Sequence, residues 1–550
     1  MTPPTQVSVL IIGSGNAGLA AAISAAESGA PSVLLIDSCP EHWAGGNSYF
    51  TAGAFRTVHA GLDDILPLVN NVSPETASRI DMQPYTDSDF AGDIHRICLG
   101  RSDKDLAKTL VGDSNEAVKW LAGHGVRFQL SFNRQAYEIG GRFKFWGGMC
   151  LKTQDGGAGL VQDERRTAER LGVKFLYSTA AKRIVLDSQT GGVKGVIVQV
   201  ASSSGSGGGA EREIQAGAVI LAAGGFEANP RMRAQYLGPG WDFAFVRGTP
   251  YNNGSCLEMA IRDVGAKQAG NWSGCHSVAW DANALPNSGD RGVSNEFTKS
   301  GYPLGLMLNL SGERFVDEGV DMRNYTYAIF GKAILAQPGH AAFQVWDATM
   351  TPWLRGEEYR EEIVERITAD TLEELAGECV KRGLRNPSKF LSTIKEYNEA
   401  VAAFQEENPD HKWDPAVKDG LSTQSSQKQL ALAKSNWATP LTKGPYVAVK
   451  VTCGVTFTFG GLAVDHETAG VISSATNAPV PGLYCVGEML GGLFYDNYPG
   501  GSGLTSGAVF GRRAGRAAAT RVRHRYLQLP ILEDYADFSA ISTVQKLCLF

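Results

Sequence analysis

The chain has 550 residues, of which 43% are hydrophobic and 20% charged, a composition typical of a globular protein. At roughly 150 residues per domain, this length allows about two to four domains. The formal net charge is −6, so no basic excess attracts nucleic acid or anionic lipid, and we expect neither as a partner.

The apolar runs are too short to cross a membrane. Val7–Ile12 and Ala218–Ala223 have strand length, whereas a spanning helix needs about 18 apolar residues. The first run leaves no room for a signal peptide, and the nine cysteines are scattered without a C-x-x-C pair. We therefore predict a cytoplasmic protein with no membrane span, no disulfide framework and no metal site.

The N-terminal segment combines two short apolar runs with a glycine-rich turn between them. Val7–Ile12 predicts a strand buried on both faces, Gly13-Ser14-Gly15-Asn16-Ala17-Gly18 follows it, and Leu19–Ser28 favours a helix. A second strand, Val33–Ile36, ends at Asp37. In this order the glycines permit a tight turn, approach to a pyrophosphate and close helix packing, while the acid accepts hydrogen bonds from ribose hydroxyls.

This motif alone does not distinguish NAD from FAD. A second glycine-rich segment, Gly45–Gly53, follows the acid. It suits a long dinucleotide whose second half continues past the pyrophosphate, which favours FAD. The alternative is a surface loop without a ligand.

Further glycine clusters mark both ends of the chain. Ala218–Phe226 predicts a buried strand that ends in glycines, where a ligand can bind, and Gly500–Gly503 opens a helix of small residues over Leu504–Ala519. Between them, Asn271–Gly301 indicates loop, and a helix is expected after Asn386-Pro387. This pattern predicts one cofactor domain interrupted by an inserted domain.

Together the motifs resemble the fumarate reductase/succinate dehydrogenase flavoprotein family. They follow the family's order over about residues 10–520 and comprise Gly13–Gly18, Gly46-Asn47-Ser48, Ala222–Phe226, Gly312–Glu318, Arg323, Gly460-Gly461, Tyr484–Glu488 and Phe510-Gly511-Arg512. Within the family, Asp321–Ala328 and Asn497–Gly503 are most similar to tricarballylate dehydrogenases. The sequence around Tyr498 also resembles that of 3-ketosteroid dehydrogenases.

The resemblance implies an α/β fold with a Rossmann-like FAD-binding domain of the glutathione reductase type, interrupted by an α+β capping domain. The implied boundaries are 1–270 and 453–527 for the two parts of the FAD-binding domain, 271–452 for the capping domain, and 528–550 for a C-terminal tail. It also implies hydride exchange between a substrate carbon and flavin N5, coupled to proton exchange at the neighbouring carbon.

The resemblance assigns three catalytic residues. Arg323 occupies the position of the family's catalytic arginine, and His276 that of its first substrate-binding histidine. Because a guanidinium resists deprotonation, either the site favours loss of the Arg323 proton or Arg323 only stabilises developing negative charge. Tyr498 replaces a carboxylate-binding arginine, and Phe457–Phe459 replaces a second histidine, so fumarate itself is a poor candidate. Tyr498 is expected to hydrogen-bond a carbonyl or carboxyl oxygen.

The family's Glu/Arg proton-relay pair has no counterpart at the corresponding spacing, where Thr298 and Gly301 stand. The residues expected to bind FAD are Gly13, Gly15, Asn16, Ala17, Gly18, Asp37, Ser38, Gly46, Asn47, Ser48, Gly53, Ala181, Ala223, Gly224, Glu488, Ser502, Gly503 and Leu504. Asn47–Thr51 contains no histidine at the place where membrane-complex members attach flavin covalently, so FAD is expected to bind noncovalently.

The leading interpretation is an FAD-dependent, tricarballylate dehydrogenase-like enzyme. It would dehydrogenate a C–C single bond adjacent to a carboxylate or carbonyl and pass electrons to a separate acceptor or O2. The alternatives are a reductase of an activated C=C bond or an O2-using oxidase on the same fold. A noncatalytic flavin-binding protein is disfavoured, because Arg323, His276 and Glu488 are all present.

Overall fold

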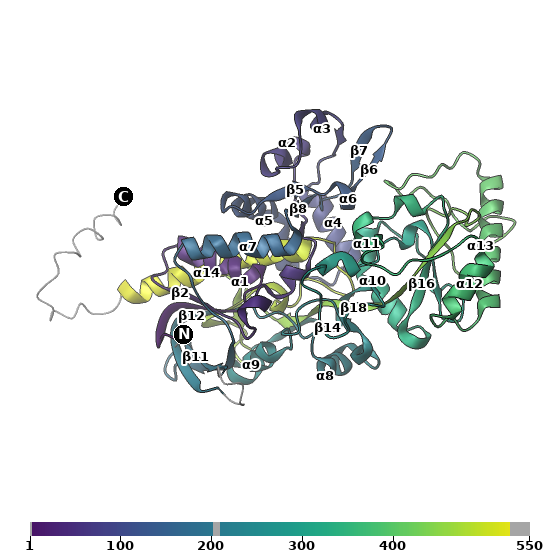
Figure 1. The fold of residues 1–550 in the computed structure, drawn as a ribbon. Coiled ribbons are helices and arrows are strands. Elements are labelled where there is room, and N and C mark those ends of the chain that lie inside the picture. Colours follow the sequence, from purple (N-terminus) through teal and green to yellow (C-terminus); the bar gives the residue numbers. More distant parts are fainter. Residues whose placement is uncertain (1–2, 202–208, 528–550) are drawn as a thin grey trace, which may run out of the picture.

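The computed structural model describes residues 3–201 and 209–527. Two parts lie side by side: a cofactor half around an eight-stranded sheet, and a cap around a six-stranded sheet (Figure 1). The C-terminal tail expected at 528–550 lies outside the described residues.

The eight-stranded sheet has a parallel centre with antiparallel additions. The parallel strands, in spatial order, are β9 (Lys174–Leu176), β2 (Val33–Ile36), β1 (Gln6–Ile12), β12 (Glu211–Leu221) and β20 (Pro479–Cys485). The antiparallel strands are β10 (Thr179–Leu186), β11 (Val193–Val200) and β19 (Gly470–Ile472).

Both faces of this sheet are buried. Val9 and Ile11 of β1 pack into one hydrophobic cluster, and Leu10 and Ile12 pack into another on the opposite face. Successive side chains of a strand point to opposite faces, so a strand covered on both sides is apolar without alternation. This explains the continuous apolar run that predicted the strand.

Two helices on one face approach each other closely. α1 (Asn16–Glu27) follows β1 directly, and α14 (Ser502–Leu527) packs along it, starting earlier and ending later than the predicted Leu504–Ala519. A Cβ added at Gly511 or Gly515 of α14 would lie 2.6 or 2.4 Å from a backbone oxygen of α1. Glycine at this spacing therefore allows the contact between the two helices.

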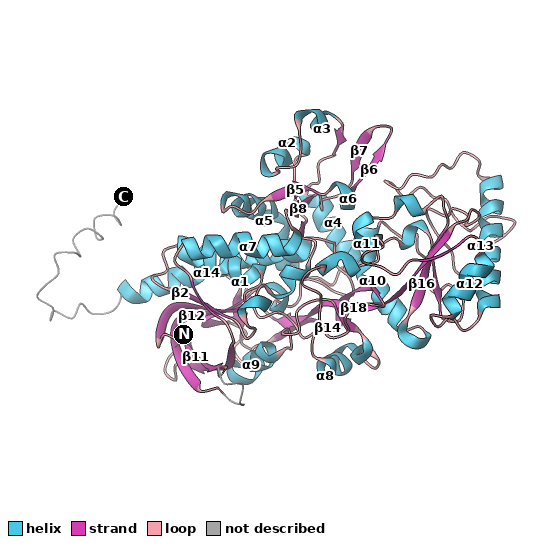
Figure 2. Cartoon of the chain, viewed as in Figure 1, coloured by secondary structure: helices cyan, strands magenta, loops and turns pink. Residues whose placement is uncertain are grey.

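The cap has a hydrophobic core of its own. Its strands are β13 (Phe245–Val246), β14 (Gln268–Asp281), β15 (Leu306–Asn309), β16 (Ala342–Trp346), β17 (Ile367–Ala369) and β18 (Tyr446–Leu462). Its longer helices are α10 (Arg323–Leu335), α12 (Leu372–Val380) and α13 (Pro387–Glu407). Figure 2 shows α12 and α13 at the end of the molecule away from the larger sheet.

Two long strands connect the cap with the cofactor half. β14 and β18 pair antiparallel from Gln268 opposite Leu462 to Asp281 opposite Val451. The boundaries expected at 270/271 and 452/453 fall inside these strands, and the division into domains stays a prediction.

The loop predicted at Asn271–Gly301 is wrong for its first part, because residues 271–281 belong to β14. Register shifts beside Asn271 and His276 interrupt the regular alternation, and the hydrogen-bonding partner, β18, lies far along the chain. Gly460 and Gly461 also lie within β18, where added Cβ atoms would lie 2.6 Å from Trp272 and 2.2 Å from a backbone oxygen.

Two three-stranded sheets and further helices complete the cofactor half and its border with the cap. The sheets contain β3 (Ala54–Phe55), β8 (Leu151–Thr153) and β5 (Phe128–Leu130), and β4 (Ile80–Asp81), β7 (Arg142–Phe145) and β6 (Ala136–Ile139). The helices are α2 (Leu62–Ile65), α3 (Pro74–Ser78), α4 (Asp87–Ile97), α5 (Lys104–Gly123), α6 (Phe132–Gln135), α7 (Gly156–Arg170), α8 (Pro230–Met232), α9 (Ser255–Val264) and α11 (Gly356–Tyr359). Across the described ranges, no helix combines the length and apolarity needed to cross a membrane.

Candidate active site

A large cavity lies where the larger sheet meets the cap. Its empty volume is about 2070 Å³, counted to its open mouth. Ile12, Asp37 and Ala222 line it, so β1, β2 and β12 all end at its wall. Ligands of open α/β sheets bind at this carboxyl edge.

Most residues predicted to bind FAD line this cavity; among the described lining residues, Gly18, Gly53 and Ser502 are missing. A Cβ at Gly18 would lie 2.0 Å from the Gly13 oxygen, and one at Gly53 would lie 1.9 Å from Thr153 Oγ1. The Ser502 hydroxyl donates to a carbonyl in the turn before α14. These three residues therefore shape the backbone around the cavity.

Asp37 fixes the glycine-rich turn. Its Oδ2 accepts hydrogen bonds from the backbone nitrogen of Ser14 at 2.8 Å and from the Ser14 hydroxyl at 2.6 Å. Gly13 has a φ of 113°, and a Cβ there would lie 2.2 Å from the Ala222 oxygen, so no other residue fits. Asp37 thus braces the turn while it also lines the cavity.

The N-terminus of α1 fits the phosphates of a dinucleotide. Its N-cap is Gly15, which offers no side-chain cap, and Gly15, Asn16 and Ala17 line the cavity. The buried Oδ1 of Asn16, a hydrogen-bond acceptor, has no partner among the described residues, so it is open to a donor group of a ligand. An uncapped helix N-terminus stabilises anions through its N–H groups and its dipole. The residues present therefore fit FAD, whose pyrophosphate this turn would hold.

Asn47 and Glu488 tie the cofactor side of the cavity to β18. Asn47 Nδ2 donates to Glu227 Oε1 and to the Thr456 oxygen, each at 2.6 Å, and Glu488 Oε1 accepts from the Thr458 nitrogen at 2.7 Å. Burial raises the pKa of both Glu227 and Glu488, and the neighbouring Glu488 raises that of Glu227 further. Both causes favour the protonated form of Glu227.

The three residues predicted to be catalytic meet in this cavity although they belong to distant segments. His276 on β14 pairs with Phe457 on β18. The Tyr498 ring centroid lies 4.9 Å from that of His276 and 4.9 Å from that of Phe457. The β14–β18 ladder thus places His276 and Phe457 against Tyr498.

His276 is neutral in this setting. Its burial, together with the positive charge of Arg247, lowers its pKa well below the usual value for a histidine. The imidazole is therefore expected to act as a hydrogen-bonding group and not as a cation at neutral pH.

Arg323 is the first residue of α10, with 9% of its surface exposed. Its Nη2 donates to the Arg134 oxygen at 2.9 Å, and its Cζ lies 5.4 Å from the Tyr137 ring and 5.8 Å from the Trp146 ring. Aromatic faces at such distances stabilise a guanidinium. Backbone and aromatic groups therefore hold this buried cation in the cavity wall.

The segment that carries Tyr498 is fastened to the start of α10. The Gly500 nitrogen donates to the Asn324 oxygen at 3.1 Å, and Asn497 Nδ2 donates to the Tyr325 oxygen at 2.6 Å. These bonds fix the Tyr498 segment relative to the helix that begins at Arg323.

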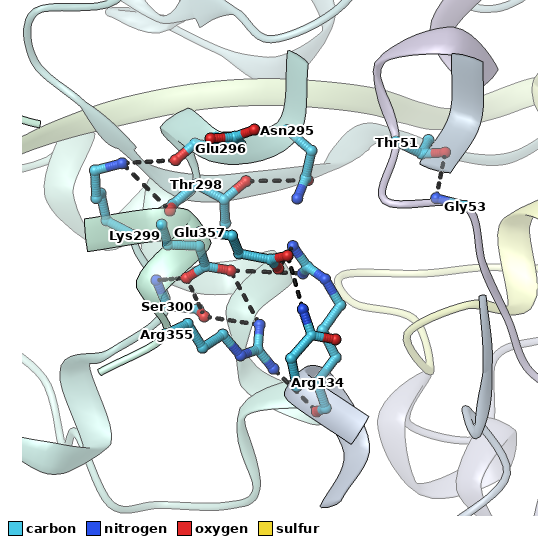
Figure 3. A network of polar contacts seen from close by, with 12 residues as sticks. Thr51, Gly53, Arg134, Asn295, Glu296, Thr298, Lys299, Ser300, Arg355 and Glu357 are labelled. Carbon is cyan, nitrogen blue, oxygen red and sulfur yellow. Dashed lines mark hydrogen bonds and ion pairs between the residues drawn. The ribbon is translucent and has the colours of Figure 1, made fainter. Parts of the chain in front are cut away.

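A charged network that the sequence did not reveal borders Arg323. Arg355 Nη1 donates to Glu358 Oε1 at 3.0 Å and to Ser300 Oγ at 3.2 Å, and its Nη2 donates to the Arg134 oxygen at 3.0 Å. The Arg134 side chain pairs with Glu357 and, at 3.5 Å, with Glu358. Figure 3 shows Arg134, Ser300, Arg355 and Glu357 turned toward one another.

Burial and neighbouring charges set the ionisation of this network. Burial, and then the adjacent charge of Arg323, lowers the pKa of Arg355 to about 10. Burial alone would raise the pKa of Glu358, but Arg355, Arg134 and the bonds from Ser300 lower it to about 2. Arg355 and Glu358 are therefore both charged at neutral pH. Arg134, Arg355 and Glu358 lie in segments without a recognisable motif, so no sequence signal pointed to them.

No metal centre emerges from the part of the chain that the structure describes, where no group of three or more His, Cys, Asp or Glu side chains could hold an ion.

A family model matches most of the chain. The model of the FAD binding domain family matches residues 8–504. The chain belongs to this family.

Two curated proteins and one solved structure are similar to the chain. The chain is 28% identical over 517 residues to a fumarate reductase (cytochrome) of Shewanella frigidimarina, covering 94% of this chain and 78% of the relative. It is 27% identical over 543 residues to a vinyl phenol reductase of Lactiplantibacillus plantarum, covering 93% and 96%. Its fold is similar to that of a 3-ketosteroid Δ1-dehydrogenase of Sterolibacterium denitrificans, with a TM-score of 0.69, 19% identity and coverage of 94% and 100%.

The resemblance to fumarate reductase flavoproteins and the α/β fold with an FAD-binding domain are thus confirmed. The chain is an FAD-dependent dehydrogenase or reductase that acts on CH–CH groups. The narrower resemblance to tricarballylate dehydrogenases stays a prediction.

Asp37→Ala should weaken FAD binding. It removes the acceptor that braces the turn and the expected acceptor for ribose hydroxyls, and a charge-assisted hydrogen bond is worth about 1.5–3 kcal/mol. Titration of the apoprotein with FAD, followed by flavin fluorescence, should show affinity reduced by about tenfold or more. Asp63→Ala, which removes an exposed carboxylate on α2, is the control. Equal FAD affinity in the two variants would remove Asp37 from the cofactor site.

Proposed function

We propose that this protein is an FAD-dependent dehydrogenase of a C–C single bond adjacent to a carboxylate or a carbonyl. A tricarballylate-like acid is the leading substrate class, with a separate acceptor or O2 taking the electrons. The observation that carries the proposal is the convergence of Arg323, His276 and Tyr498 in the cavity that the predicted FAD-binding residues also line.

The charges of the cavity favour an acid as substrate. Beyond the residues expected to bind FAD, the described lining residues include four arginines, Arg134, Arg247, Arg323 and Arg355, and one carboxylate, Glu358. Glu357, behind this lining, pairs with Arg134, so the arginines still outnumber the carboxylates. Buried positive charge in excess is costly unless an anion offsets it. A carboxylate substrate supplies that anion, whereas a neutral ketone does not.

Each of the three residues has a defined role in this proposal. Bound FAD supplies a hydride acceptor at its N5. Tyr498 donates a hydrogen bond to the carboxyl or carbonyl oxygen of the substrate, which stabilises negative charge when the adjacent C–H loses its proton. Arg323 either accepts that proton or stabilises the developing negative charge. Neutral His276, on β14, orients the substrate.

The aromatic wall limits access of water. Phe457, Phe459 and Phe494 line the cavity around Tyr498 and pack edge to face or tilted against one another. An apolar wall strengthens the electrostatic interactions of Tyr498 and Arg323 with the substrate, because it lowers the local dielectric constant.

A reductase is the second candidate function. It is favoured by the reductases among the relatives, those of fumarate and of vinyl phenol. The same residues would serve the reverse reaction, in which Arg323 delivers a proton to an activated C=C bond.

FAD should be bound noncovalently. The histidine among the described lining residues is His276, on the cap strand β14, and Gly46–Thr51 contains none. Acid precipitation of the purified protein should leave its flavin absorbance in the supernatant. Flavin that remains with the pellet would contradict this proposal.

Arg323→Lys should slow flavin reduction far more than it weakens substrate binding. Lysine keeps the positive charge but loses the planar fork of donors, and an interaction made mainly in the transition state affects the chemical step. Rapid-mixing measurements of the flavin absorbance separate the two effects. Arg96→Lys is the matched control, because Arg96 pairs at the surface with Asp321, two residues before Arg323. A variant with weaker binding and a normal rate of flavin reduction would show that Arg323 only binds substrate.

Tyr498→Phe should lower the rate of flavin reduction by about 10²-fold, a loss similar to that of one oxyanion donor. The change removes one hydroxyl and almost no volume, so folding and FAD content should persist. Tyr495→Phe, in the same loop, is the control. If Tyr498→Phe matches the wild-type rate, Tyr498 only packs against the aromatic wall, and His276 becomes the candidate for the polarising group.

A further inference from the structure

Three buried polar side chains line one corner of the cavity, and each has atoms without a hydrogen-bond partner among the described residues. Arg323, Asn324 and Arg355 all line it, and Asn324 has 2% of its surface exposed. The Nε atoms of both arginines and the Nδ2 and Oδ1 atoms of Asn324 are buried without a hydrogen-bond partner among the described residues. Buried polar atoms of this kind normally find partners, so the corner is built for a ligand.

The start of α10 adds a positive field at the same corner. Arg323 and Asn324 are the first two residues of this 13-residue helix, and no side chain caps its N-terminus. The unpaired N–H groups and the dipole of a helix N-terminus favour an anion. This field acts together with the unpartnered side chains of the same two residues.

The charges of the corner sum to one positive charge in excess. Arg323 and Arg355 both donate to the oxygen of Arg134, at 2.9 and 3.0 Å, so the two guanidinium groups are neighbours. Glu358 pairs with Arg355, and Glu357 pairs with Arg134. Three guanidinium groups against two carboxylates leave a single positive charge, which matches one carboxylate better than a doubly charged phosphate.

We propose that Arg355 and Asn324, together with Arg323, form the subsite for one carboxylate group of the substrate. The two Nε–H groups and the Asn324 amide N–H donate to its oxygens, and its charge neutralises the corner. Arg355 and Asn324 are thus specificity-determining residues that favour acids over neutral carbonyl compounds. The inference rests on the proposed function for the identity of the substrate, but it concerns binding and not turnover.

The test compares succinate with its neutral isostere succinamide on the holoenzyme. Binding is followed by the change in the flavin absorption spectrum. The wild type should bind succinate at least tenfold more tightly than succinamide. Arg355→Met should weaken succinate binding by about tenfold or more, as expected for loss of a charge-assisted bond, and should leave the affinity for succinamide within about twofold.

Two further variants keep the test decisive if Arg355→Met does not fold. Arg355→Met with Glu358→Gln removes both charges of the buried pair, so no carboxylate remains buried opposite a missing partner. Asn324→Ala leaves the network of ion pairs intact and should still weaken succinate binding. Arg360→Met is the matched control, because Arg360 pairs with Glu296 nearer the surface of the same segment.

The outcomes separate this subsite from the reaction. Succinate binding that is unchanged in the variants, or that falls by the same factor as succinamide binding, overturns the subsite. A wild type that does not prefer succinate also overturns it. Selective loss of succinate binding supports the subsite even if no acid reduces the flavin, a result that would instead refute the proposed dehydrogenation.

Discussion

The site depends on one antiparallel pair of strands that passes from the cap into the cofactor half. β14 and β18 pair over most of their length, so their backbone hydrogen bonds fix the distance and register between the two halves. Through this pairing His276 lies opposite Phe457. The next residue, Thr458, reaches the cofactor side, where its backbone nitrogen donates a hydrogen bond to Glu488. A slip of one residue would turn His276 away from Tyr498 and move the aromatic wall out of the cavity.

The second constraint is the cost of burying guanidinium groups. Arg323 and Arg355 lie together in a region with little solvent, and the protein stabilises them with the Arg134 oxygen, the carboxylate of Glu358 and the rings of Tyr137 and Trp146. These partners do not saturate the corner, since both Nε atoms lack a partner within the described residues. Buried arginines with unfilled hydrogen bonds are more typical of binding sites than of structural ion pairs, because a bound substrate can supply the missing partners. The cavity therefore combines preorganised positive charge with an apolar wall, as the proposed proton abstraction requires.

The sequence predicted local features better than distant contacts. The turn Gly13–Gly18 and Asp37 were recognisable because their order reflects the backbone requirements of a dinucleotide site. β14 was missed because its regular alternation is interrupted and its partner is remote in sequence. Arg355 and Glu358 could not be predicted. Arg355 precedes the four-residue helix α11 and Glu358 lies within it, and only the folded chain brings Arg355 and Arg323 together at the Arg134 oxygen. Nor does a motif reveal every contact of its residues. Asn47 lines the cavity as predicted, but its amide also donates hydrogen bonds within the protein.

In the proposed reaction an acid substrate delivers its electrons to the flavin of this protein. The most direct measurement is anaerobic mixing of the oxidised holoenzyme with tricarballylate, with the flavin absorbance followed over time. The yellow absorbance should be lost, and one unsaturated acid should form per flavin reduced. An enzyme whose flavin stays oxidised with saturated acids and ketones, but whose reduced flavin is reoxidised by unsaturated acids, would contradict dehydrogenation and establish a reductase.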